Sequence, residues 1–292
     1  MELNWIDRQD SPARSIALGT FDGVHRGHQE LLRETIARQP QGGTSSVLTF
    51  SIPPEQYFRG QLQLLSTFSR RVELFRSFGI DEVAWLNFGS KLASMEAHDF
   101  VENILIGEMK AAEIICGHDY HFGKGRVGDA EFLRKQGERH GFSVKVISPV
   151  QDEGGHTISS TAIRRLLQEG DLAQATEYLG YYPTYQAVAE EVRGGSEIRF
   201  RFDPALVLPR DGVYLIWCSI APSQGSAAIA WPGDAQQMLA VFLDEIPKLT
   251  GVQQVLEVQL LSKLRGGKYQ EATESDVLKA REVLAGICLQ DA

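Results

Sequence analysis

The chain has 292 residues, of which 43% are hydrophobic and 23% are charged, so it is globular and long enough for one large or two ordinary domains. Its formal net charge of −9 argues against a general nucleic-acid-binding protein, because phosphate backbones are bound by clustered Lys and Arg side chains. A small anionic ligand is not excluded, since it needs only a local site.

The cysteines and the N-terminus exclude several other classes. Cys116, Cys218 and Cys288 are far apart and form no CxxC pair, so the sequence predicts neither a disulfide framework nor a zinc site. The N-terminal stretch lacks the basic start and apolar run of a signal peptide, and no apolar run approaches the roughly 18 residues of a membrane span. We expect a cytoplasmic protein with no nucleic-acid or membrane partner, and the sequence gives no indication of its oligomeric state.

The first 180 residues alternate strand and helix patterns. Short apolar runs predict buried strands at residues 15–19, 45–50, 82–88, 112–117 and 143–148. Helical patterns lie between them at residues 27–38, 68–78, 96–109 and 129–140. This alternation predicts βαβ crossovers and a parallel sheet covered on both faces. Ligands of such sheets bind at the carboxyl ends of the strands, so the segment after the first strand lies at a suitable edge.

The pattern changes after residue 158. Two short helices are predicted within residues 158–180, and Pro183 marks a linker. Short strand-like runs then predict a small β-barrel or sandwich, at residues 185–192, 198–202, 212–218, 226–231, 238–243 and 252–261. A helix is predicted at residues 273–288. We therefore expect two domains, at residues 1–182 and 183–292.

Residues 19–32, "GTFDGVHRGHQELL", join the first strand to a helix through a glycine-containing turn. The free N–H groups of a helix N-terminus after such a turn form an anion site. His25 and His28 can add donors to polyphosphate oxygens, and Gly27 leaves room for phosphate to approach the backbone. One alternative is that one histidine caps the helix and the other is solvated. Another is metal ligation, for which the sequence indicates no third ligand.

The longer stretch "LGTFDGVHRGHQELL", residues 18–32, is similar to the first motif of prokaryotic FAD synthetases, members of the HxGH nucleotidyltransferase superfamily. Further matching stretches follow in order at residues 48–58, 65–88, 115–129 and 158–180. The resemblance implies a Rossmann-like nucleotidyltransferase domain with a parallel sheet, which transfers the adenylyl group of ATP to FMN and requires Mg²⁺. In this motif, His25 and His28 contact the ATP phosphates and stabilise charge as pyrophosphate leaves. The small-molecule partners implied are thus FMN and ATP.

The resemblance also implies further site residues. In the first motif, Gly19, Thr20 and Phe21 place backbone near the nucleotide, and Asp22 helps to hold the turn. In "ISSTAIR", residues 158–164, the family reading is that hydroxyls and an arginine bind the ATP phosphates, and the arginine can act on the leaving pyrophosphate. The matching residues are Ser159, Ser160, Thr161 and Arg164. Without the resemblance, this stretch reads as a helix N-cap followed by a surface arginine.

Two other motifs are less regular. "FGKGRVG", residues 122–128, matches the dinucleotide fingerprint GxGxxG. It does not follow a strand end, so we expect that it is not a dinucleotide-binding motif. The family reading is a mobile loop that contacts flavin and nucleotide, and solvated loop cations are the alternative. Its candidate residues are Asp119, Phe122, Gly123, Lys124 and Arg126. "TFSIPPEQ" departs from the family form TFDPHP: Thr49, Phe50 and Pro54 are kept, but an expected imidazole is missing, which predicts altered affinity or rate.

In bifunctional family members the second domain is a riboflavin kinase barrel. Residues 208–215 and 255–284 resemble it, which predicts a riboflavin-kinase-like β-barrel with a C-terminal helix. However, residues 195–207 contain no Pro-Thr-Ala-Asn motif, and Leu239 and Ala240 stand where a catalytic Glu is expected. We therefore expect that the kinase activity is lost. The alternatives are a fully bifunctional enzyme, a non-catalytic flavin- or nucleotide-binding protein, and nucleotidyl transfer to another acceptor.

Overall fold

A computed structural model describes most of the chain, and it forms two compact units. The described residues are 3–60, 62–191, 197–221, 224–233, 236–244, 254–267 and 271–290. The first unit comprises residues 1–62 and 67–159, and the second comprises residues 63–66 and 160–292. The helices predicted within residues 158–180 therefore pack in the second unit, whereas the domain border predicted at residue 182 places them in the first.

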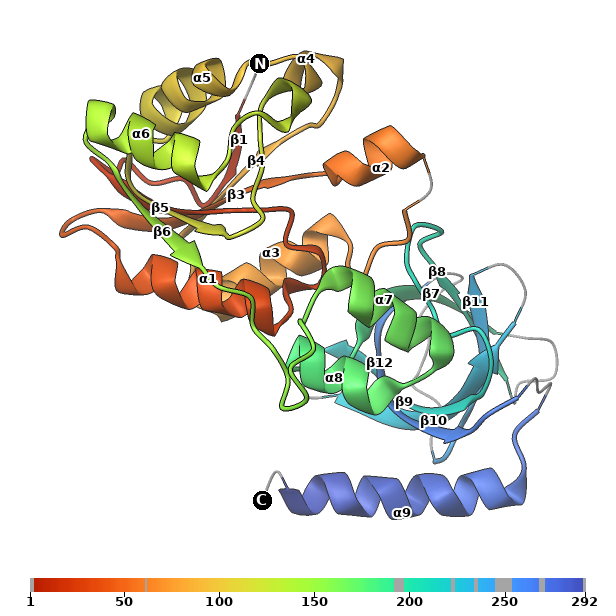
Figure 1. The fold of residues 1–292 in the computed structure, drawn as a ribbon. Coiled ribbons are helices and arrows are strands. Elements are labelled where there is room, and N and C mark those ends of the chain that lie inside the picture. The colour runs from red at the N-terminus through yellow and green to blue at the C-terminus, as the bar shows by residue number, and fades with distance from the viewer. Residues whose placement is uncertain are drawn as a thin grey trace. The chain divides into compact units, whose positions relative to one another are not determined.

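The first unit is built on a six-stranded sheet in the order β1-β4-β3-β2-β5-β6 (Figure 1). Its strands are β1 (Asn4–Ile6), β2 (Arg14–Leu18), β3 (Thr44–Phe50), β4 (Glu82–Leu86), β5 (Ala111–Gly117) and β6 (Ser143–Ile147). The pairs β2–β3, β3–β4, β2–β5 and β5–β6 are parallel, which confirms the predicted parallel sheet. The short edge strand β1 is antiparallel and was not predicted, because three half-buried residues give no recognisable run.

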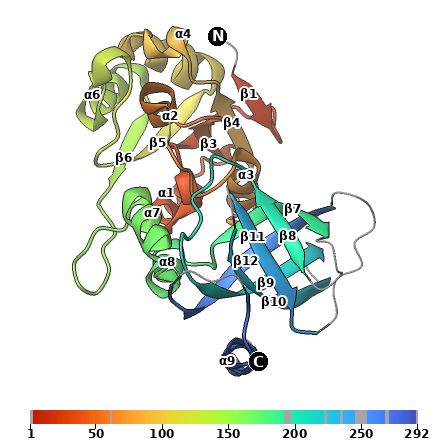
Figure 2. The same cartoon turned by 90° about the vertical axis from the view of Figure 1, so that its right-hand side faces the viewer.

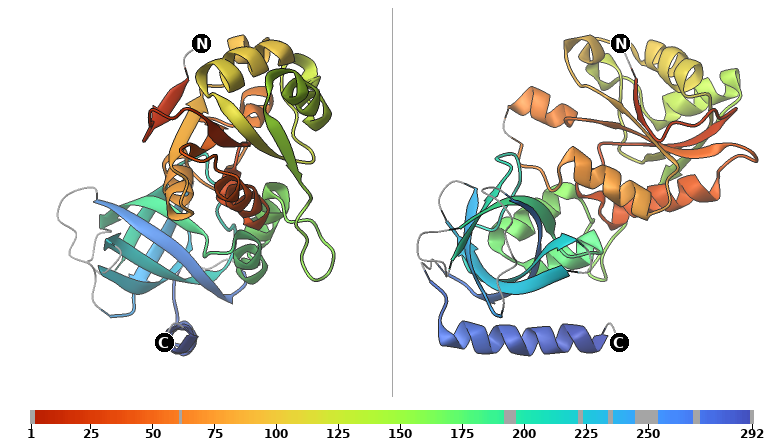
Figure 3. Two further views of the ribbon diagram at one scale, coloured as in Figure 1. Left: turned by 90° about the vertical axis from the view of Figure 1, so that its left-hand side faces the viewer. Right: turned by 180° about the vertical axis from the view of Figure 1, so that it is seen from behind.

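Helices cover both faces of this sheet, as Figures 1 and 3 show. One face carries α1 (Arg26–Ala37) and α3 (Phe68–Ser77). The other carries α4 (Ser90–Ala93), α5 (Ala97–Asp99), the π-helix η2 (Phe100–Glu108) and α6 (Ala130–His140). Ile16, Leu18 and Leu48 of the sheet share a buried cluster with residues of η2 and α6, which joins the second layer to the sheet. A further short helix, α2 (Pro54–Arg59), follows β3.

The strand order defines where a ligand would bind. The chain runs outward from β2 through β3 and β4, and then returns to the other side of β2 for β5 and β6. Strand order therefore reverses between β2 and β5, and ligands of open α/β sheets bind outside the carboxyl ends of the strands at this point. The segment that follows β2 is the one that carries His25 and His28.

The second unit contains two helices, a closed antiparallel barrel and a C-terminal helix (Figure 2). The helices are α7 (Ser160–Glu169), α8 (Leu172–Leu179) and α9 (Glu274–Gln290). The barrel order is β10-β11-β8-β7-β12-β9. Its strands are β7 (Thr184–Glu191), β8 (Ile198–Phe202), β9 (Val213–Ala221), β10 (Gln224–Pro232), β11 (Gln237–Phe242) and β12 (Gln254–Arg265). The predicted strands are confirmed where the structure describes them; residues 192, 252 and 253 lie outside the described part.

The barrel strands show the alternation expected of a closed sheet. In β8, Ile198, Phe200 and Phe202 are buried while the residues between them are more exposed. Strand β9 differs, because Val213 and Leu215 belong to a cluster with Ala280 of α9, so its second face is also covered. The fold class is confirmed: a Rossmann-like, mostly parallel α/β sheet is followed by an antiparallel barrel and a C-terminal helix.

Candidate functional site

The turn between β2 and α1 has an unusual backbone. Phe21, Gly23 and Val24 all have positive φ angles, of 54°, 77° and 37°. Glycine adopts this region without strain, but for a β-branched residue such as Val24 it is a costly conformation. Both Phe21 and Val24 are fully buried, so surrounding packing can hold the turn in this shape. Strain of this kind concentrates at functional sites.

His25 is the N-cap of α1. Its Nδ1 atom accepts a hydrogen bond of 3.4 Å from the backbone N–H of His28. An accepting Nδ1 carries no proton, so in the neutral ring the proton is on Nε2, which can donate to a ligand. The N–H groups of Arg26 and Gly27, at the start of the helix, have no acceptor within the helix because of helix geometry. The capping alternative is therefore correct for His25, and the predicted anion site stays a prediction.

His28 is not simply solvated. Its ring stacks on that of His25, with centroids 3.7 Å apart and an interplanar angle of 20°. The Phe21 ring lies 5.2 Å away, and itself packs edge-on against Phe75 of α3. Burial, followed by the charges of His25 and Arg71, lowers the pKa of His28 well below its usual range. The imidazole is therefore neutral at neutral pH, and its buried Nδ1 finds no hydrogen-bond partner among the described residues.

Two glycines give these rings their space. A Cβ on Gly27 would lie 3.1 Å from Cε1 and Nδ1 of His25, and 3.6 Å from the carbonyl oxygen of Ile158. A Cβ on Gly19 would lie 3.1 Å from Cε2 of Phe21. Contacts this short force a neighbour to move, so a side chain at either position would displace a ring of the site. The position of the His25 ring therefore also requires a glycine at residue 27, in addition to the predicted approach of phosphate.

Arg71 of α3 was not predicted as a site residue, although its side chain contacts the turn after β2. Its side chain is buried; Nη1 donates to the Thr20 carbonyl (2.6 Å) and to Thr49 Oγ1 (3.3 Å), and Nη2 donates to the Ser51 carbonyl (3.1 Å). Burial lowers the pKa of Arg71 to about 10, and the charge of Asp22 opposes this, so the guanidinium remains charged at neutral pH. The available signal was a cation at a core-facing position of an amphipathic helix.

Thr49 and Phe50 end β3 beside the turn. Thr49 Oγ1 donates to the Thr20 carbonyl (3.2 Å), so this predicted site residue does lie with the first motif. Phe50 packs edge-on against Phe88, which follows β4, with centroids 5.7 Å apart. Tyr57 and Phe58 of α2 pack edge-on against the same Phe88 ring.

The result is an exposed apolar surface after β3, which we call the aromatic patch and define by Ile52, Tyr57, Phe58 and Phe88. Ile52, Tyr57 and Phe58 are 49%, 47% and 68% exposed. Large apolar side chains are seldom exposed side by side without a partner. Where TFDPHP is expected, Pro54 occupies the first turn of α2 and Ser51 Oγ donates to the side-chain oxygen of Asn87 (2.6 Å). The substituted motif therefore still forms an ordered strand-to-helix connection.

The loop after β5 holds a second group of predicted residues. Phe122 is buried in the core of the first unit, where its ring packs on Phe100 and Phe132, so its side chain serves packing. Gly123 has a φ of 73°, and a Cβ there would lie 2.8 Å from the backbone of Ala97, so only glycine fits. The remaining loop residues, Asp119, Lys124 and Arg126, are exposed. Lys124 lies 3.4 Å from a Glu96 carboxylate oxygen, a surface pair that a ligand can displace at little cost.

The motif at residues 158–164 lies at the division between the units. Ser159 belongs to the first unit, whereas Ser160, Thr161 and Arg164 start α7 in the second. Ile158, two residues before α7, is the residue whose carbonyl faces Gly27. Ser160 is the first residue of α7, and Thr161 is exposed while Arg164 is partly buried.

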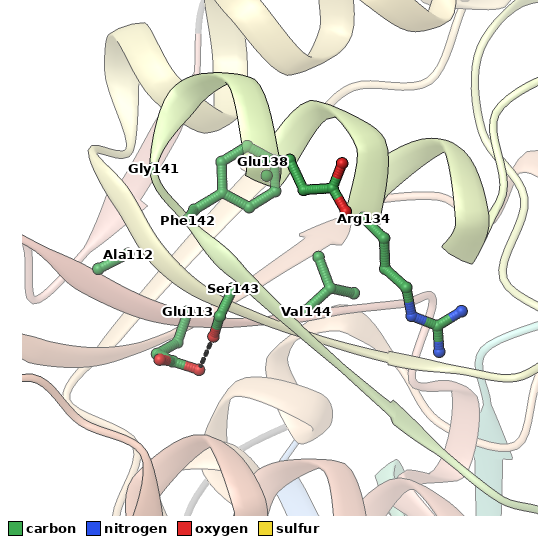
Figure 4. Close-up of a pocket in the computed structure, with 9 residues that line it drawn as sticks. Ala112, Glu113, Arg134, Glu138, Gly141, Phe142, Ser143 and Val144 are labelled. Atoms are coloured by element: carbon green, nitrogen blue, oxygen red, sulfur yellow. Dashed lines mark hydrogen bonds between the residues drawn. The ribbon is translucent and has the colours of Figure 1, made fainter.

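A cavity of about 540 Å³ opens at the amino ends of β5 and β6 (Figure 4). It is lined by Ala112 and Glu113 at the start of β5, by Ser143 and Val144 at the start of β6, and by α6. The Ser143 hydroxyl donates to the Glu113 carboxylate, which leaves this carboxylate committed to the fold. No predicted site residue lines this cavity, and it lies at the amino ends of the strands, away from the turn after β2.

Within the described residues, no group of three or more His, Cys, Asp or Glu side chains could hold a metal ion. None of the helices that the structure describes combines the length and apolar character that a membrane span requires.

Comparison with known proteins identifies the chain's relatives. Residues 7–162 match the FAD synthetase family. The bifunctional riboflavin kinase/FMN adenylyltransferase of Escherichia coli K12 is 30% identical over 254 residues, covering 84% of this chain and 77% of the relative. The enzyme of the same name from Pseudomonas fluorescens is 31% identical over 227 residues, covering 75% and 70%. A crystal structure of a macrolide-efflux protein from Streptococcus pneumoniae superposes with a TM-score of 0.76 at 26% identity, covering 95% and 93%.

The family match spans strands β2 to β6 of the sheet, the turn with His25 and His28, and the loop after β5, up to the start of α7. The two relatives named above match 75% and 84% of the chain, more than the family match covers. Together, these matches show that the chain belongs to the FAD synthetase family.

Proposed function

We propose that this chain transfers the adenylyl group of ATP to FMN, giving FAD and pyrophosphate. The observation that carries the proposal is the pair of stacked imidazoles at the N-terminus of α1, where the strand order reverses. A helix N-terminus attracts phosphate through free N–H groups and a positive dipole end. A match to the FAD synthetase family supplies the reaction that this anion site would serve.

In the proposed reaction, a phosphate oxygen of FMN attacks the α-phosphorus of ATP. The bond from this phosphorus to the oxygen bridging the α- and β-phosphates breaks, and pyrophosphate leaves. Such transfers need positioning and charge stabilisation rather than a covalent enzyme intermediate. The Nε2–H of His25, the imidazole of His28 and the first N–H groups of α1 would donate hydrogen bonds to the phosphate oxygens as charge develops on the leaving group.

The other predicted residues complete the proposed site. Ser159, Ser160, Thr161 and Arg164 are proposed to bind ATP phosphates, on the strength of the motif match. Mg²⁺ is proposed to arrive with ATP as part of the substrate, because Mg²⁺ is usually held by substrate phosphates and water with few protein ligands. Lys124 and Arg126 are exposed on the loop after β5, and either can pair with a phosphate.

The aromatic patch is proposed to hold the isoalloxazine ring of FMN. It follows β3 and β4 at their carboxyl ends, the same edge of the sheet as the turn after β2. Tyr57 and Phe58 present exposed rings there, and a flat aromatic ring system gains from stacking and from burial of apolar area. The patch would thus replace the contact that the family's imidazole in TFDPHP is expected to provide.

We further propose that the second unit has lost riboflavin kinase activity. Leu239 and Ala240 lie within β11, and Ala240 is fully buried, so the position expected for the catalytic Glu offers no carboxylate. Without a base for the ribityl hydroxyl, phosphoryl transfer would be slow. Gly195, Ser196, Glu245 and Ile246, which belong to the compared motifs, lie outside the described residues. The fully bifunctional enzyme is the second candidate, because the relatives named above carry both activities in their names.

One experiment separates these functions. Purified protein is incubated with ATP and Mg²⁺ and either FMN or riboflavin, and the flavins are resolved by chromatography. FAD from FMN, with riboflavin left unchanged, is the expected result. FMN or FAD formed from riboflavin would overturn the loss of kinase activity and support the bifunctional enzyme. No product from either flavin, with FMN or ATP still bound, would favour a non-catalytic binding protein.

A further inference from the structure

Arg71 is a buried cation held by neutral oxygens. Its side chain is only 1% exposed, and its hydrogen-bond acceptors are the Thr20 and Ser51 carbonyls and the Thr49 hydroxyl. Its Nε has no hydrogen-bond partner among the described residues. Burying a charge costs several kcal/mol, and an apolar side chain would fill the same space at a lower cost. Packing alone therefore does not account for this residue.

The hydrogen bonds of Arg71 connect the segments that follow β2 and β3. Thr20 opens the turn after β2, and Ser51 follows β3, so one guanidinium bridges the segments that lead to the two histidines and to the aromatic patch. Phe75, one helical turn further along α3, packs edge-on against Phe21 of the same turn. Helix α3 therefore contacts the turn through a hydrogen bond from Arg71 and through apolar packing of Phe75.

We propose that Arg71 is a positioning residue for adenylyl transfer: its guanidinium fixes the turn after β2 and thereby holds the imidazole of His28 where the phosphates of ATP bind. This inference rests on the proposed function. A planar fork with five N–H donors can hold two carbonyls in a set geometry, which an uncharged or shorter side chain cannot do. Displacement of a reacting group by about 1 Å can reduce turnover on the order of 10²-fold.

The charge of Arg71 has a second effect. The groups that act on the ring of His28 are His25, on the preceding turn, and Arg71, on α3, and both lower the pKa of His28 in addition to burial. Asp22, buried in the turn, acts on Arg71 with the opposite sign. Removal of the guanidinium is therefore expected to raise the pKa of His28 toward its ordinary value, and a purely structural role would not require this change.

The test compares Arg71→Gln with wild type and with Arg76→Met. Arg76 lies on the same helix but forms an exposed ion pair with Asp7, 2.7 Å away, so it is a matched control for loss of a cation. Three quantities are measured: the melting temperature, kcat and KM for ATP with FMN as acceptor, and the titration midpoint of His28 by NMR, assigned with His28→Gln.

For Arg71→Gln we expect kcat to fall on the order of 10²-fold, with KM for ATP changed less than about threefold and the His28 midpoint raised. Arg76→Met should match wild type in all three. A folded Arg71→Gln with kcat within about threefold of wild type, or with an unchanged His28 midpoint, would overturn the proposal. If wild type forms no FAD, the proposed function fails, but the His28 midpoint, which needs no substrate, still tests Arg71.

If Arg71→Gln does not fold, Arg71→Lys tests the positioning role instead, because this variant keeps the buried charge. A single ammonium cannot hold both carbonyls as the fork does, so kcat should fall about threefold to tenfold at unchanged KM, and the His28 midpoint should stay low. Wild-type kcat in Arg71→Lys would show that the fork is not needed and would overturn the positioning role.

Discussion

The ring of His28 stacks on the ring of His25, 3.7 Å between centroids, while the backbone N–H of His28 donates to Nδ1 of His25. The same two residues therefore cap the helix and orient each other. The cap fixes the tautomer of His25, and the stack shields His28 from water. Both rings are therefore held together at the N-terminus of α1.

The lowered pKa of His28 predicts that the protein loses stability in mild acid. The unfolded chain takes up a proton on this residue near pH 6.5, whereas the folded chain does so only at lower pH. The free energy of unfolding contributed by His28 is therefore complete above about pH 7 and falls as the pH drops below about 6.5. Urea unfolding between pH 8 and pH 5 should show a weaker fall in His28→Gln than in wild type. Parallel profiles for the two proteins would contradict the assignment.

Gly27→Ala should impair adenylyl transfer more than folding. The new Cβ would lie 3.1 Å from the His25 ring and displace it from its cap and its stack. We expect kcat to fall on the order of 10-fold or more, since the ring would leave the phosphate position. Gly286→Ala in α9 is the control, because a Cβ there meets nothing within 4 Å. Equal kcat values for Gly27→Ala and wild type would refute the role of the ring position.

Glu82→Gln should destabilise the protein while leaving its chemistry intact. Glu82 and Arg14 form a buried ion pair of 2.7 Å at the start of β4 and β2, the edge of the sheet opposite the turn. Burial raises the pKa of Glu82, but hydrogen bonds from Arg14, Gln9 and Ser46 outweigh it and leave the pKa below its usual range. Loss of one partner leaves a buried charge unpaired and should cost about 3–5 kcal/mol of unfolding free energy.

Glu30→Gln is the control for this substitution, because the Glu30–Arg33 pair is exposed and should contribute less than about 1 kcal/mol. Urea unfolding at pH 7.5 measures both variants. A loss of stability in Glu82→Gln no larger than that in Glu30→Gln would contradict the account of the buried pair.

Phe58→Ser should weaken the binding of FMN without weakening the binding of ATP. Phe58 is the most exposed member of the aromatic patch, at 68%, so its removal should leave the fold unchanged and reduce stacking area. Loss of one aromatic contact should raise KM for FMN about tenfold, with KM for ATP unchanged. Leu278→Ser in α9, where the side chain is 66% exposed, controls for the loss of exposed apolar surface. An unchanged KM for FMN would exclude the patch as the flavin site.

The core strands and the longer helices could be predicted from the sequence, because apolar runs and periodicity report burial and the parallel core strands are buried on both faces. Strand β1 could not, because an edge strand of three half-buried residues has no such period. The position of His25 after β2 was predictable from local order along the chain. The depressed pKa of His28 and the contacts of Arg71 were not, because they depend on contacts among the turn after β2, the end of β3 and α3, which are far apart in sequence.

The central claim is that His28 stabilises charge during adenylyl transfer to FMN, and the rate of FAD formation by wild type and His28→Ala tests it most directly. Both proteins are incubated with FMN, ATP and Mg²⁺, and FAD is followed by chromatography. Wild type is expected to form FAD and pyrophosphate in equal amounts, and His28→Ala should be slower by on the order of 10²-fold or more. Near-normal turnover by a folded His28→Ala, or no FAD from wild type, would contradict the account.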